Sequence, residues 1–293
     1  DLIHAHGYGA CTWGRLAGRL LGIPVIVHER CNYRTVPLTQ RPVERLLGPG
    51  TKTALAVSES SRQFCIHKRF MRPEAVHTLY NGILMEDLPR AEPEWKESFR
   101  RERGLGATDP LLGVVGRLEA HKGLQDALHA LQIVRQRQPS ARLWVVGDGS
   151  YADELHRRVE ELGLTTAVDF LGFRRDARNI IQCFDVHLFP SHMEGTPNTL
   201  FEGLGVGNAI VASRTDGQEE ILVDERHALL FDPGDAAAMA NRVLRILENP
   251  ALEQSLRSEA RTLSKQFDGR QTIRAMEHLY EEILHSRHSA IAR

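Results

Sequence analysis

Two cations flank a turn near the middle of the chain. Arg117 follows the apolar run Leu111–Val115, and Lys122 comes directly before Gly123, where the next helical pattern begins. Fixed cations beside the free backbone N–H groups of a helix N-terminus favour the binding of a diphosphate. Taken singly, Lys122 also fits an ordinary surface lysine, and Arg117 fits an ion pair at a strand end.

A second segment, 194–202, carries a carboxylate at each end. Thr196 is predicted to cap a helix, and Pro197 suits its first turn. Glu194 then stands in the preceding loop, while Glu202 lies more than a turn inside the helix. Eight residues along a helix rise roughly 12 Å, more than the roughly 5 to 9.5 Å that separates the acid and base of a glycosidase. The spacing favours two carboxylates that hold opposite ends of one ligand, and it disfavours a hydrolase.

Metal and cofactor motifs are weak in this sequence. His4 and His6 alternate on one face of a predicted strand, so a metal-binding pair is conceivable. No third ligand follows at convincing spacing, and neither H-E-x-x-H nor C-x-x-C occurs. The run 192–194 resembles the start of a zinc deaminase motif, but no P-C-x-x-C follows it. The run 147–152 fails G-x-G-x-x-G at the third glycine. We therefore predict no metal site and no nicotinamide cofactor.

The elements that must position these residues follow a β-then-α pattern. Apolar runs alternate with amphipathic helical segments, which predicts parallel sheets covered on both faces. Glycines and polar residues gather after the strands, where parallel sheets bind ligands, so we expect a ligand in a cleft between two domains. The predicted strands are 2–5, 24–28, 54–57, 76–79, 111–115, 142–146, 168–171, 185–189, 209–212 and 229–231.

Composition agrees with a globular protein of two domains. The chain has 293 residues, 42% hydrophobic content and a net charge of −1, so no overall charge directs it to nucleic acid. No apolar run reaches the roughly 18 residues of a membrane span. The four cysteines show no paired spacing, which indicates free thiols in a reducing compartment. One basic stretch fits a solvated face or a lipid-surface patch, and its members are Arg41, Arg45, Lys52, Arg62, Lys68, Arg69 and Arg72.

Several motifs, in this order and spacing, resemble a known family. GRLEAHKG at 116–123, EGTPNTLFE at 194–202 and DLIHAHG at 1–7 resemble the retaining GT-B glycosyltransferases of family 4, also called glycosyl transferases group 1. The resemblance spans essentially the whole chain and implies two Rossmann-like domains whose parallel sheets face each other across a cleft. The expected organisation is a partial acceptor domain at 1–88, a linker at 89–108, a donor domain at 109–267, and a helix at 268–293 that crosses back to the first domain.

The resemblance implies a nucleotide-sugar donor, UDP- or GDP-linked, held mainly by the second domain. Arg117 and Lys122 would neutralise its diphosphate without a metal ion, and Glu202 would accept hydrogen bonds from the ribose. His6 would contact the donor sugar near the reacting carbon. The implied catalytic residues are His6, Arg117, Lys122 and Glu194. The implied donor-binding residues are Gly116, Arg117, Lys122, Phe173, Arg174, Glu194, Gly195, Thr196, Pro197, Asn198, Thr199 and Glu202.

The implied activity is metal-independent hexosyl transfer with retention, to a sugar or lipid-linked acceptor in polysaccharide or glycoconjugate assembly. The implied location is cytoplasmic, with peripheral contact at the inner face of the plasma membrane as a further option. Two alternatives stay open: a catalytically inactive fragment that still binds nucleotide, and a sugar-nucleotide epimerase of GT-B fold.

Two departures from the family pattern bear on these expectations. The chain begins at Asp1 inside a predicted strand, without the family's initial glycine-rich loop, so we expect roughly 70 to 100 residues to be missing. Gly203, Gly205 and Gly207 follow Glu202 where helix formers are usual, and each interior glycine costs roughly 0.8 to 1 kcal/mol. We therefore expect a short or loose helix there.

Overall fold

The computed structural model describes residues 1–30 and 36–291. Contacts divide the chain into two compact units. The first unit consists of Asp1–Gly82, Met193–Thr196 and Phe267–Arg293, and the second consists of Ile83–His192 and Pro197–Gln266. Cys31 and its neighbours up to residue 35 lie outside the described residues.

The first unit is built on a parallel sheet of four strands in the order β1-β2-β3-β4. Each strand connects to the next through a helical segment, as expected for a parallel sheet. The elements are β1 (Ile3–His6), α1 (Tyr8–Leu21), β2 (Val25–Glu29), α2 (Arg41–Leu47), β3 (Thr53–Ala56), α3 (Glu59–His67), β4 (Val76–Thr78) and α12 (Gly269–Ile291).

One apolar cluster of the first unit contains several small residues. Ala5, Val27 and Ala54 point from three neighbouring strands to one face, where they pack with Cys65 of α3 and Cys11 of α1. Cys11, Cys65 and the second unit's Cys183 are free thiols and buried. Because side chains alternate across a strand, the residues next to Ala5 and Val27 point to the opposite face of the sheet.

Helix α12 packs within the first unit. Thr272 donates a hydrogen bond to the carbonyl of Tyr80, and the backbone of Gly269 lies so close to Gly82 that a Cβ there would come within 2.7 Å of it. Farther along α12, the Tyr280 hydroxyl lies 2.6 Å from Nδ1 of His4 on β1.

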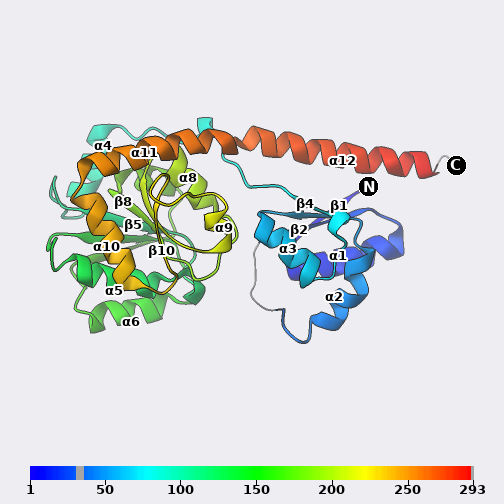
Figure 1. The fold of residues 1–293 in the computed structure, drawn as a ribbon, viewed down its shortest axis with the longest axis horizontal. Helices are drawn as coiled ribbons and strands as arrows, with labels where there is room; N and C mark the ends of the chain where they lie inside the picture. Colours follow the sequence, from blue (N-terminus) through cyan, green and yellow to red (C-terminus); the bar gives the residue numbers. More distant parts are fainter. Residues whose placement is uncertain (31–35, 292–293) are drawn as a thin grey trace. The chain divides into compact units, whose positions relative to one another are not determined.

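The second unit is built on a parallel sheet of six strands in the order β10-β9-β8-β5-β6-β7, with helices on both of its faces (Figure 1). Its strands are β5 (Leu111–Val115), β6 (Arg142–Val146), β7 (Val168–Gly172), β8 (Val186–Phe189), β9 (Ala209–Ser213) and β10 (Leu229–Phe231). Its helices are α4 (Pro93–Arg101), α5 (Leu124–Val134), α6 (Ala152–Glu161), α7 (Ala177–Ile180), α8 (Asn198–Val206), α9 (Asp216–Glu219), α10 (Ala236–Leu247) and α11 (Pro250–Ser264).

The alternation of side chains along β5 and β6 divides the interior of the second unit into two cores. Leu112 and Leu143 point to one face and join a large cluster with residues of α5, α6 and α10. Leu111 and Trp144, one position away, point to the other face and pack with Phe99 of α4. A strand buried on both faces reads as a continuous apolar run, which explains why the sequence predicted these strands well.

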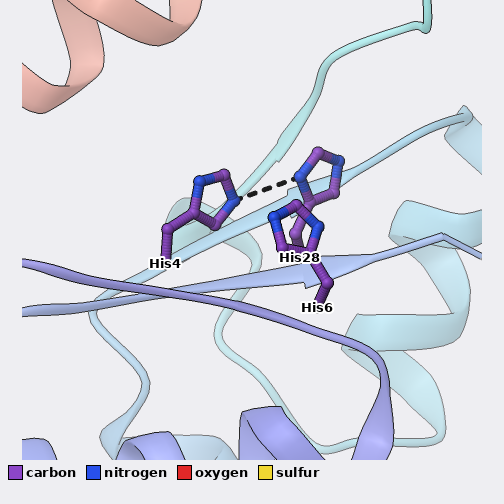
Figure 2. Close-up of side chains that lie close together, drawn as sticks. All are labelled: His4, His6 and His28. Carbon is purple, nitrogen blue, oxygen red and sulfur yellow. Dashed lines mark hydrogen bonds between the residues drawn. The ribbon is translucent and has the colours of Figure 1, made fainter.

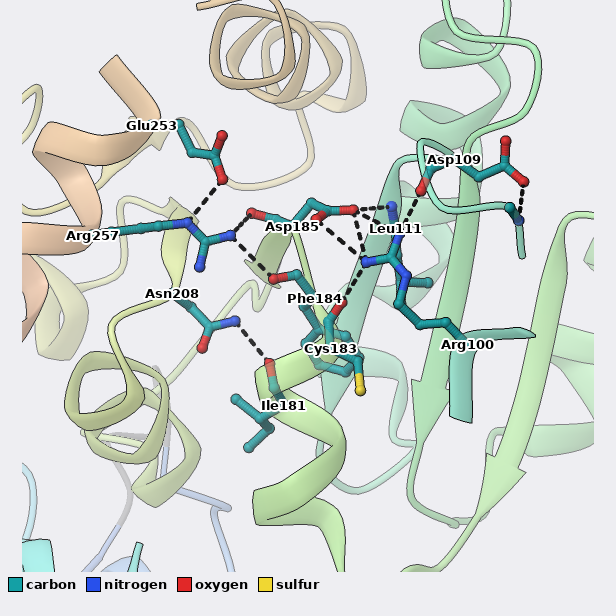
Figure 3. Close-up of polar contacts among 11 residues, drawn as sticks. Arg100, Asp109, Leu111, Ile181, Cys183, Phe184, Asp185, Asn208, Glu253 and Arg257 are labelled. Atoms are coloured by element: carbon teal, nitrogen blue, oxygen red, sulfur yellow. Dashed lines mark hydrogen bonds and ion pairs between the residues drawn. The ribbon is translucent and has the colours of Figure 1, made fainter. Parts of the chain in front are cut away.

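Polar side chains tie the helices to the amino ends of β5 and β8 (Figure 3). The Asp185 carboxylate accepts hydrogen bonds from Arg100 of α4, at 3.2 Å, and from the backbone N–H of Leu111, at 2.7 Å. Arg257 of α11 donates a hydrogen bond to the carbonyl oxygen of Asp185. Asn208 donates one to the carbonyl oxygen of Ile181. These bonds satisfy backbone groups at the edge of the sheet opposite the carboxyl ends of the strands.

The two parallel sheets confirm the predicted α/β fold class. The stretch expected as a linker, 89–108, contains α4, whose Trp95 and Phe99 pack on the core of the second unit. Part of the basic stretch is not on the surface: Arg69 is 3% exposed and pairs with Glu29 and Glu44. The spacing of charges did not reveal this, because the partners of Arg69 lie 25 and 40 residues away.

Candidate donor site

The strand order of the second unit puts a topological switch point at the carboxyl ends of β5 and β8. From β5 the chain proceeds to β6 and β7 on one side and then returns to pair β8 with the other side of β5. Loops after two such strands leave in opposite directions, and ligands of open α/β sheets bind where they part. The loops after β5 and β8 contain many of the predicted donor-binding residues.

The loop after β5 carries the two predicted cations. Gly116 donates from its backbone N–H to the carbonyl of Val146. Gly147, at a φ of 137°, lets the next loop approach so closely that a Cβ there would lie 1.8 Å from the Gly116 carbonyl oxygen. Arg117 is exposed and makes no ion pair with the part of the chain that the structure describes, whereas Lys122 is half-buried. The tight packing of Gly147 on Gly116 thus fixes the start of the loop that carries the solvent-facing Arg117 guanidinium.

Helix α5 begins at Leu124, two residues after Lys122. Its N-cap is Gly123, in the left-handed conformation at a φ of 70°, and no side chain caps the first turn. A Cβ at Gly123 would come within 1.9 Å of the Pro190 carbonyl oxygen in the loop after β8. Asp126, in the first turn, is held by Nε2 of His192 from that same loop. The two loops therefore pack against each other, with an uncapped helix N-terminus between them.

Helix α8 supplies a second helix N-terminus without a side-chain cap. Its N-cap is Pro197, and its first turn contains no acidic residue. The prediction that Thr196 caps this helix is wrong, because its hydroxyl donates to the carbonyl of Val57 at 3.0 Å. Asn198 is exposed and Thr199 half-buried at the start of the helix. The positive end of the α8 dipole is thus open to an anion.

The glycines of α8 serve close packing. A Cβ at Gly203 would lie 2.7 Å from Nδ1 of His187, and a Cβ at Gly205 would lie 2.3 Å from Leu88. The helix ends at Gly207, whose φ of 74° is the left-handed conformation common after helix ends. The expected short helix is confirmed at nine residues.

Glu202 is half-buried on α8 and pairs with Arg178 of α7 at 2.9 Å. Arg178 precedes Glu202 by 24 residues and shares no motif with it, so the sequence alone did not point to this residue. The guanidinium orients this carboxylate, whose oxygens can accept hydrogen bonds from neighbouring hydroxyl groups. Arg178 is thus one functional candidate that only the structure reveals.

Phe173 and Arg174 follow β7, two strands away from β5. Phe173 is 76% exposed, an unusual position for a phenylalanine. Arg174 pairs with Asp176 through Nη2 at 2.7 Å. An exposed aromatic ring beside a charged pair at this edge can stack on a planar group.

The predicted residues 194–196 contact the first unit. Gly195 is buried, and a Cβ there would lie 3.2 Å from Val57 and 3.3 Å from the carbonyl oxygen of Arg30. The carbonyl of Thr196 accepts a hydrogen bond from Nδ2 of Asn81, and the Asn81 amide oxygen accepts one from Arg30. Glu194 is half-buried. This segment therefore belongs to the carboxyl edge of the first sheet, where His6 also lies.

His6 stands in a group of three imidazoles (Figure 2). His4 and His6 come from β1 and His28 from β2, and ring nitrogens of the three lie within 4.8 Å of one another. Burial lowers the pKa of His4 to about 4 and of His28 to about 3, and it also lowers that of His6; the Arg30 guanidinium acts in the same direction on all three. All three rings are neutral at pH 7. No sequence motif links His28 to His4 and His6, because only the register of β1 and β2, which pairs His6 with His28, brings it to this face.

Comparisons with known proteins identify the class. The family model described as "Glycosyl transferases group 1" matches residues 96–263, more than half of the chain. The model described as "Glycosyltransferase Family 4" matches residues 1–86. The chain therefore belongs to the group 1 glycosyltransferases and has the GT-B fold, as the motifs predicted.

Individual relatives are moderately similar. A UDP-Gal:alpha-D-GlcNAc-diphosphoundecaprenol alpha-1,3-galactosyltransferase of Escherichia coli is 25% identical over 264 residues, which cover 86% of this chain and 67% of the relative. A D-inositol 3-phosphate glycosyltransferase of Saccharomonospora viridis is 26% identical, covering 97% and 70%. The crystal structure of Anabaena HepE in complex with UDP is 25% identical, with a TM-score of 0.86, covering 96% of this chain and 79% of HepE. HepE has also been solved with UDP-glucose.

Proposed function

We propose that this glycosyltransferase moves a sugar from a nucleoside-diphosphate donor to a hydroxyl acceptor with retention of configuration. The observation that carries the proposal is the pair of loops after β5 and β8, with exposed Arg117, half-buried Lys122 and two helix N-termini whose N-cap residues, Gly123 and Pro197, supply no side-chain cap. Two cations and two positive dipole ends at one edge suit a diphosphate, which carries the negative charge of such a donor.

The roles of the remaining residues follow from their chemistry. Glu202, held by Arg178, accepts hydrogen bonds from the ribose hydroxyls. The exposed Phe173 lies by the base, with Arg174 beside it. Glu194, the backbone from Gly195 to Asn198, and His6 hold the donor sugar. The HepE complexes with UDP and UDP-glucose support a nucleotide-linked donor, and a UDP-linked one is preferred here over a GDP-linked one.

The reaction balances without a metal ion. The bond between the anomeric carbon and the donor's terminal phosphate oxygen breaks, and a bond from that carbon to the acceptor oxygen forms on the same face of the sugar. The acceptor proton passes to the leaving phosphate. Arg117 and Lys122 stabilise the charge that develops on this phosphate, a role in which a preorganised donor is worth on the order of 3 to 4 kcal/mol.

We assign the acceptor to the sugar or lipid-linked class used in polysaccharide or glycoconjugate assembly. The E. coli relative's name contains a diphosphoundecaprenol-linked sugar, which supports a lipid-linked acceptor. No helix among the described residues is both long and apolar enough to cross a bilayer. A cytoplasmic enzyme with peripheral membrane contact would meet such an acceptor at the inner face of the membrane.

The peripheral contact is assigned to α1, α2 and the residues just before α2. Trp13, Leu20 and Leu21 of α1 are 73%, 85% and 68% exposed, and Leu38 and Leu46 are 76% and 70% exposed. Apolar side chains near basic ones suit an anionic lipid surface. Reversing Arg41 and Arg45 to glutamate should weaken binding to anionic vesicles, while reversing Arg137 of the second unit should not. Unchanged vesicle binding after the first reversal would dismiss this contact.

Nucleotide binding tests the donor site first. We expect one of UDP, GDP and ADP, with UDP favoured, to raise the melting temperature of the wild type by several degrees, because ligand at 100 times its Kd adds about 2.7 kcal/mol. The Arg117→Ala variant should lose this shift. If no nucleotide raises the melting temperature of the wild type, the proposed donor site is wrong for this chain.

Turnover tests the catalytic roles. With a UDP-sugar, release of UDP should depend on an acceptor, and Arg117→Ala or Lys122→Ala should lower it by roughly 100-fold or more. Wild-type rates in both variants would rule out their roles. Conversion of the donor to another sugar nucleotide without acceptor would instead indicate an epimerase. Nucleotide binding without any turnover would indicate an inactive binding protein.

A further inference from the structure

Three histidines converge at the carboxyl edge of the first sheet. Nε2 of His4 lies 3.2 Å from Nδ1 of His28, and a ring nitrogen of His6 lies within 4.8 Å of both positions. Figure 2 shows the three rings close together, with the contact between His4 and His28 drawn as a dashed line. The rings of His4 and His6 are stacked with centroids 4.3 Å apart.

The separation between His4 and His28 matches that of two ligands on one metal ion. A zinc–nitrogen bond of about 2.0–2.1 Å and tetrahedral angles place two ligand nitrogens about 3.3 Å apart. Three imidazoles with an open fourth position form one of the common zinc coordination sets. The His6 ring is stacked on the His4 ring, so its exposed side chain must rotate to direct a nitrogen lone pair at the ion.

The surroundings permit the His4 tautomer that a metal requires. Nδ1 of His4 lies 2.6 Å from the hydroxyl of Tyr280. When Nδ1 carries the proton and donates it to this hydroxyl, Nε2 of His4 presents its lone pair toward His28. Hydrogen bonds of this kind orient ligating histidines in metalloproteins. His28 is 3% exposed, and its Nε2 has no hydrogen-bond partner in the described structure, so its ring is already desolvated.

We propose that His4, His6 and His28 bind one divalent transition-metal ion, with Zn²⁺ as the best fit. An all-nitrogen set favours Zn²⁺, Ni²⁺ and Cu²⁺ and disfavours Mg²⁺ and Ca²⁺, which prefer oxygen ligands. The exposed side chain of His6 leaves a path for the ion from solvent. The cation of Arg30 opposes a bound metal, because its field already acts against protonation of all three rings.

The test is metal titration of the whole chain, freed of metal with a chelator. We expect Zn²⁺ to bind at one equivalent by calorimetry, and Co²⁺ to give the strong visible absorption of a tetrahedral site. Mg²⁺ should not compete. A wild type that shows no saturable Zn²⁺ binding at one equivalent and no such Co²⁺ spectrum overturns the proposal, whatever the variants do.

Variants locate the ion. His4→Ala and His6→Ala should each weaken Zn²⁺ binding by at least about tenfold, while His77→Gln, an exposed histidine on β4, should not change it. Tyr280→Phe should weaken binding less, because it removes only the orienting partner, and Arg30→Gln should strengthen it. Circular dichroism confirms that each variant is folded. Wild-type affinity in folded His4→Ala and His6→Ala variants would also overturn the proposal.

One consequence rests on the proposed function. If His6 contacts the donor sugar, a metal that holds His6 should inhibit transfer, and His4→Ala should relieve this inhibition by Zn²⁺. Binding of Zn²⁺ without inhibition would separate the metal site from the transferase site. A failure of nucleotide binding would refute the proposed function and leave the metal titration unaffected.

Discussion

The two units bury different kinds of side chains. Among the described residues, all buried arginine and glutamate side chains lie in the first unit. They are Arg15, Glu29, Glu44 and Arg69, at 7%, 5%, 0% and 3% exposure. They form a neutral network in which Arg15 pairs with Glu44 at 2.8 Å and Arg69 pairs with Glu29 at 2.7 Å. In the second unit, the buried polar side chains of the described residues are serine, threonine, asparagine, glutamine and histidine.

The difference is accompanied by one in the apolar clusters of the described residues. The second unit has two clusters, one on each face of a six-stranded sheet. The first unit has a short cluster with many small residues on a four-stranded sheet. In the first unit, buried charge pairs therefore contribute more to fixing how the helices and strands pack. Such pairs tolerate little change, because leaving one buried charge unpaired costs several kcal/mol of folding free energy, on the order of 3 to 5. We therefore expect the first unit to be sensitive to loss of charge and the second to changes in side-chain volume.

The largest expected effect is at Glu44. The substitution Glu44→Gln leaves two buried guanidinium groups with one carboxylate, and we expect a loss of about 3 to 5 kcal/mol in the free energy of unfolding. Urea unfolding, followed by a signal from the first unit, measures this loss. Asp169→Asn in the second unit, where the pair with Arg142 is partly exposed, should cost about 1 kcal/mol or less. Equal losses in the two variants would contradict the contrast between the units.

Overpacking should affect the second unit next. A Cβ at Gly113, in the middle of β5, would lie 2.2 Å from the ring of Phe184, so Gly113→Ala should cost about 1 to 3 kcal/mol. Combining it with Phe184→Leu should cost less than the sum of the two single changes. Thermal unfolding of the four proteins measures the coupling, and strict additivity would show that the ring moves aside freely.

His187 is the exception within the second unit, and pH tests it. Burial lowers the pKa of this ring to about 3, and neither ring nitrogen has a partner among the described residues. Below pH 6.5 the ring binds a proton in the unfolded state, where its pKa is about 6.5, but stays neutral in the folded state. The free energy of unfolding therefore falls as the pH drops below 6.5. We expect this ring alone to remove about 2 kcal/mol between pH 7 and pH 5. His187→Leu should flatten the measured slope, and an unchanged slope would mean that the ring is hydrated.

The smallest effect expected is a gain in the first unit. Gly9 lies in the first turn of α1, and a Cβ there would meet no atom within 4 Å. Gly9→Ala should stabilise this unit by about 0.4 to 1 kcal/mol, because it restricts the unfolded chain without changing any contact. Calorimetry measures the shift in melting temperature, and a decrease would show that the helix start needs the flexibility of glycine.

The sequence by itself determined the fold class and most of the strands. Leu111–Val115 and Arg142–Val146 were predicted with the observed bounds, because strands buried on both faces appear as apolar runs in the sequence. Arg117 and Lys122 were singled out for the same local reason, since a strand end followed by a helix start can be read from adjacent residues. Their roles in catalysis remain predictions.

Only the tertiary structure decided which distant residues meet. The register of β1 and β2 brings His28 beside His6, the packing of α7 against α8 brings Arg178 to Glu202, and Thr196 bonds to Val57 instead of capping its own helix. Arg69 reads as one more surface cation, yet it is buried between two glutamates. These contacts depend on strand order and packing between residues far apart in the chain, which local propensity and spacing do not encode.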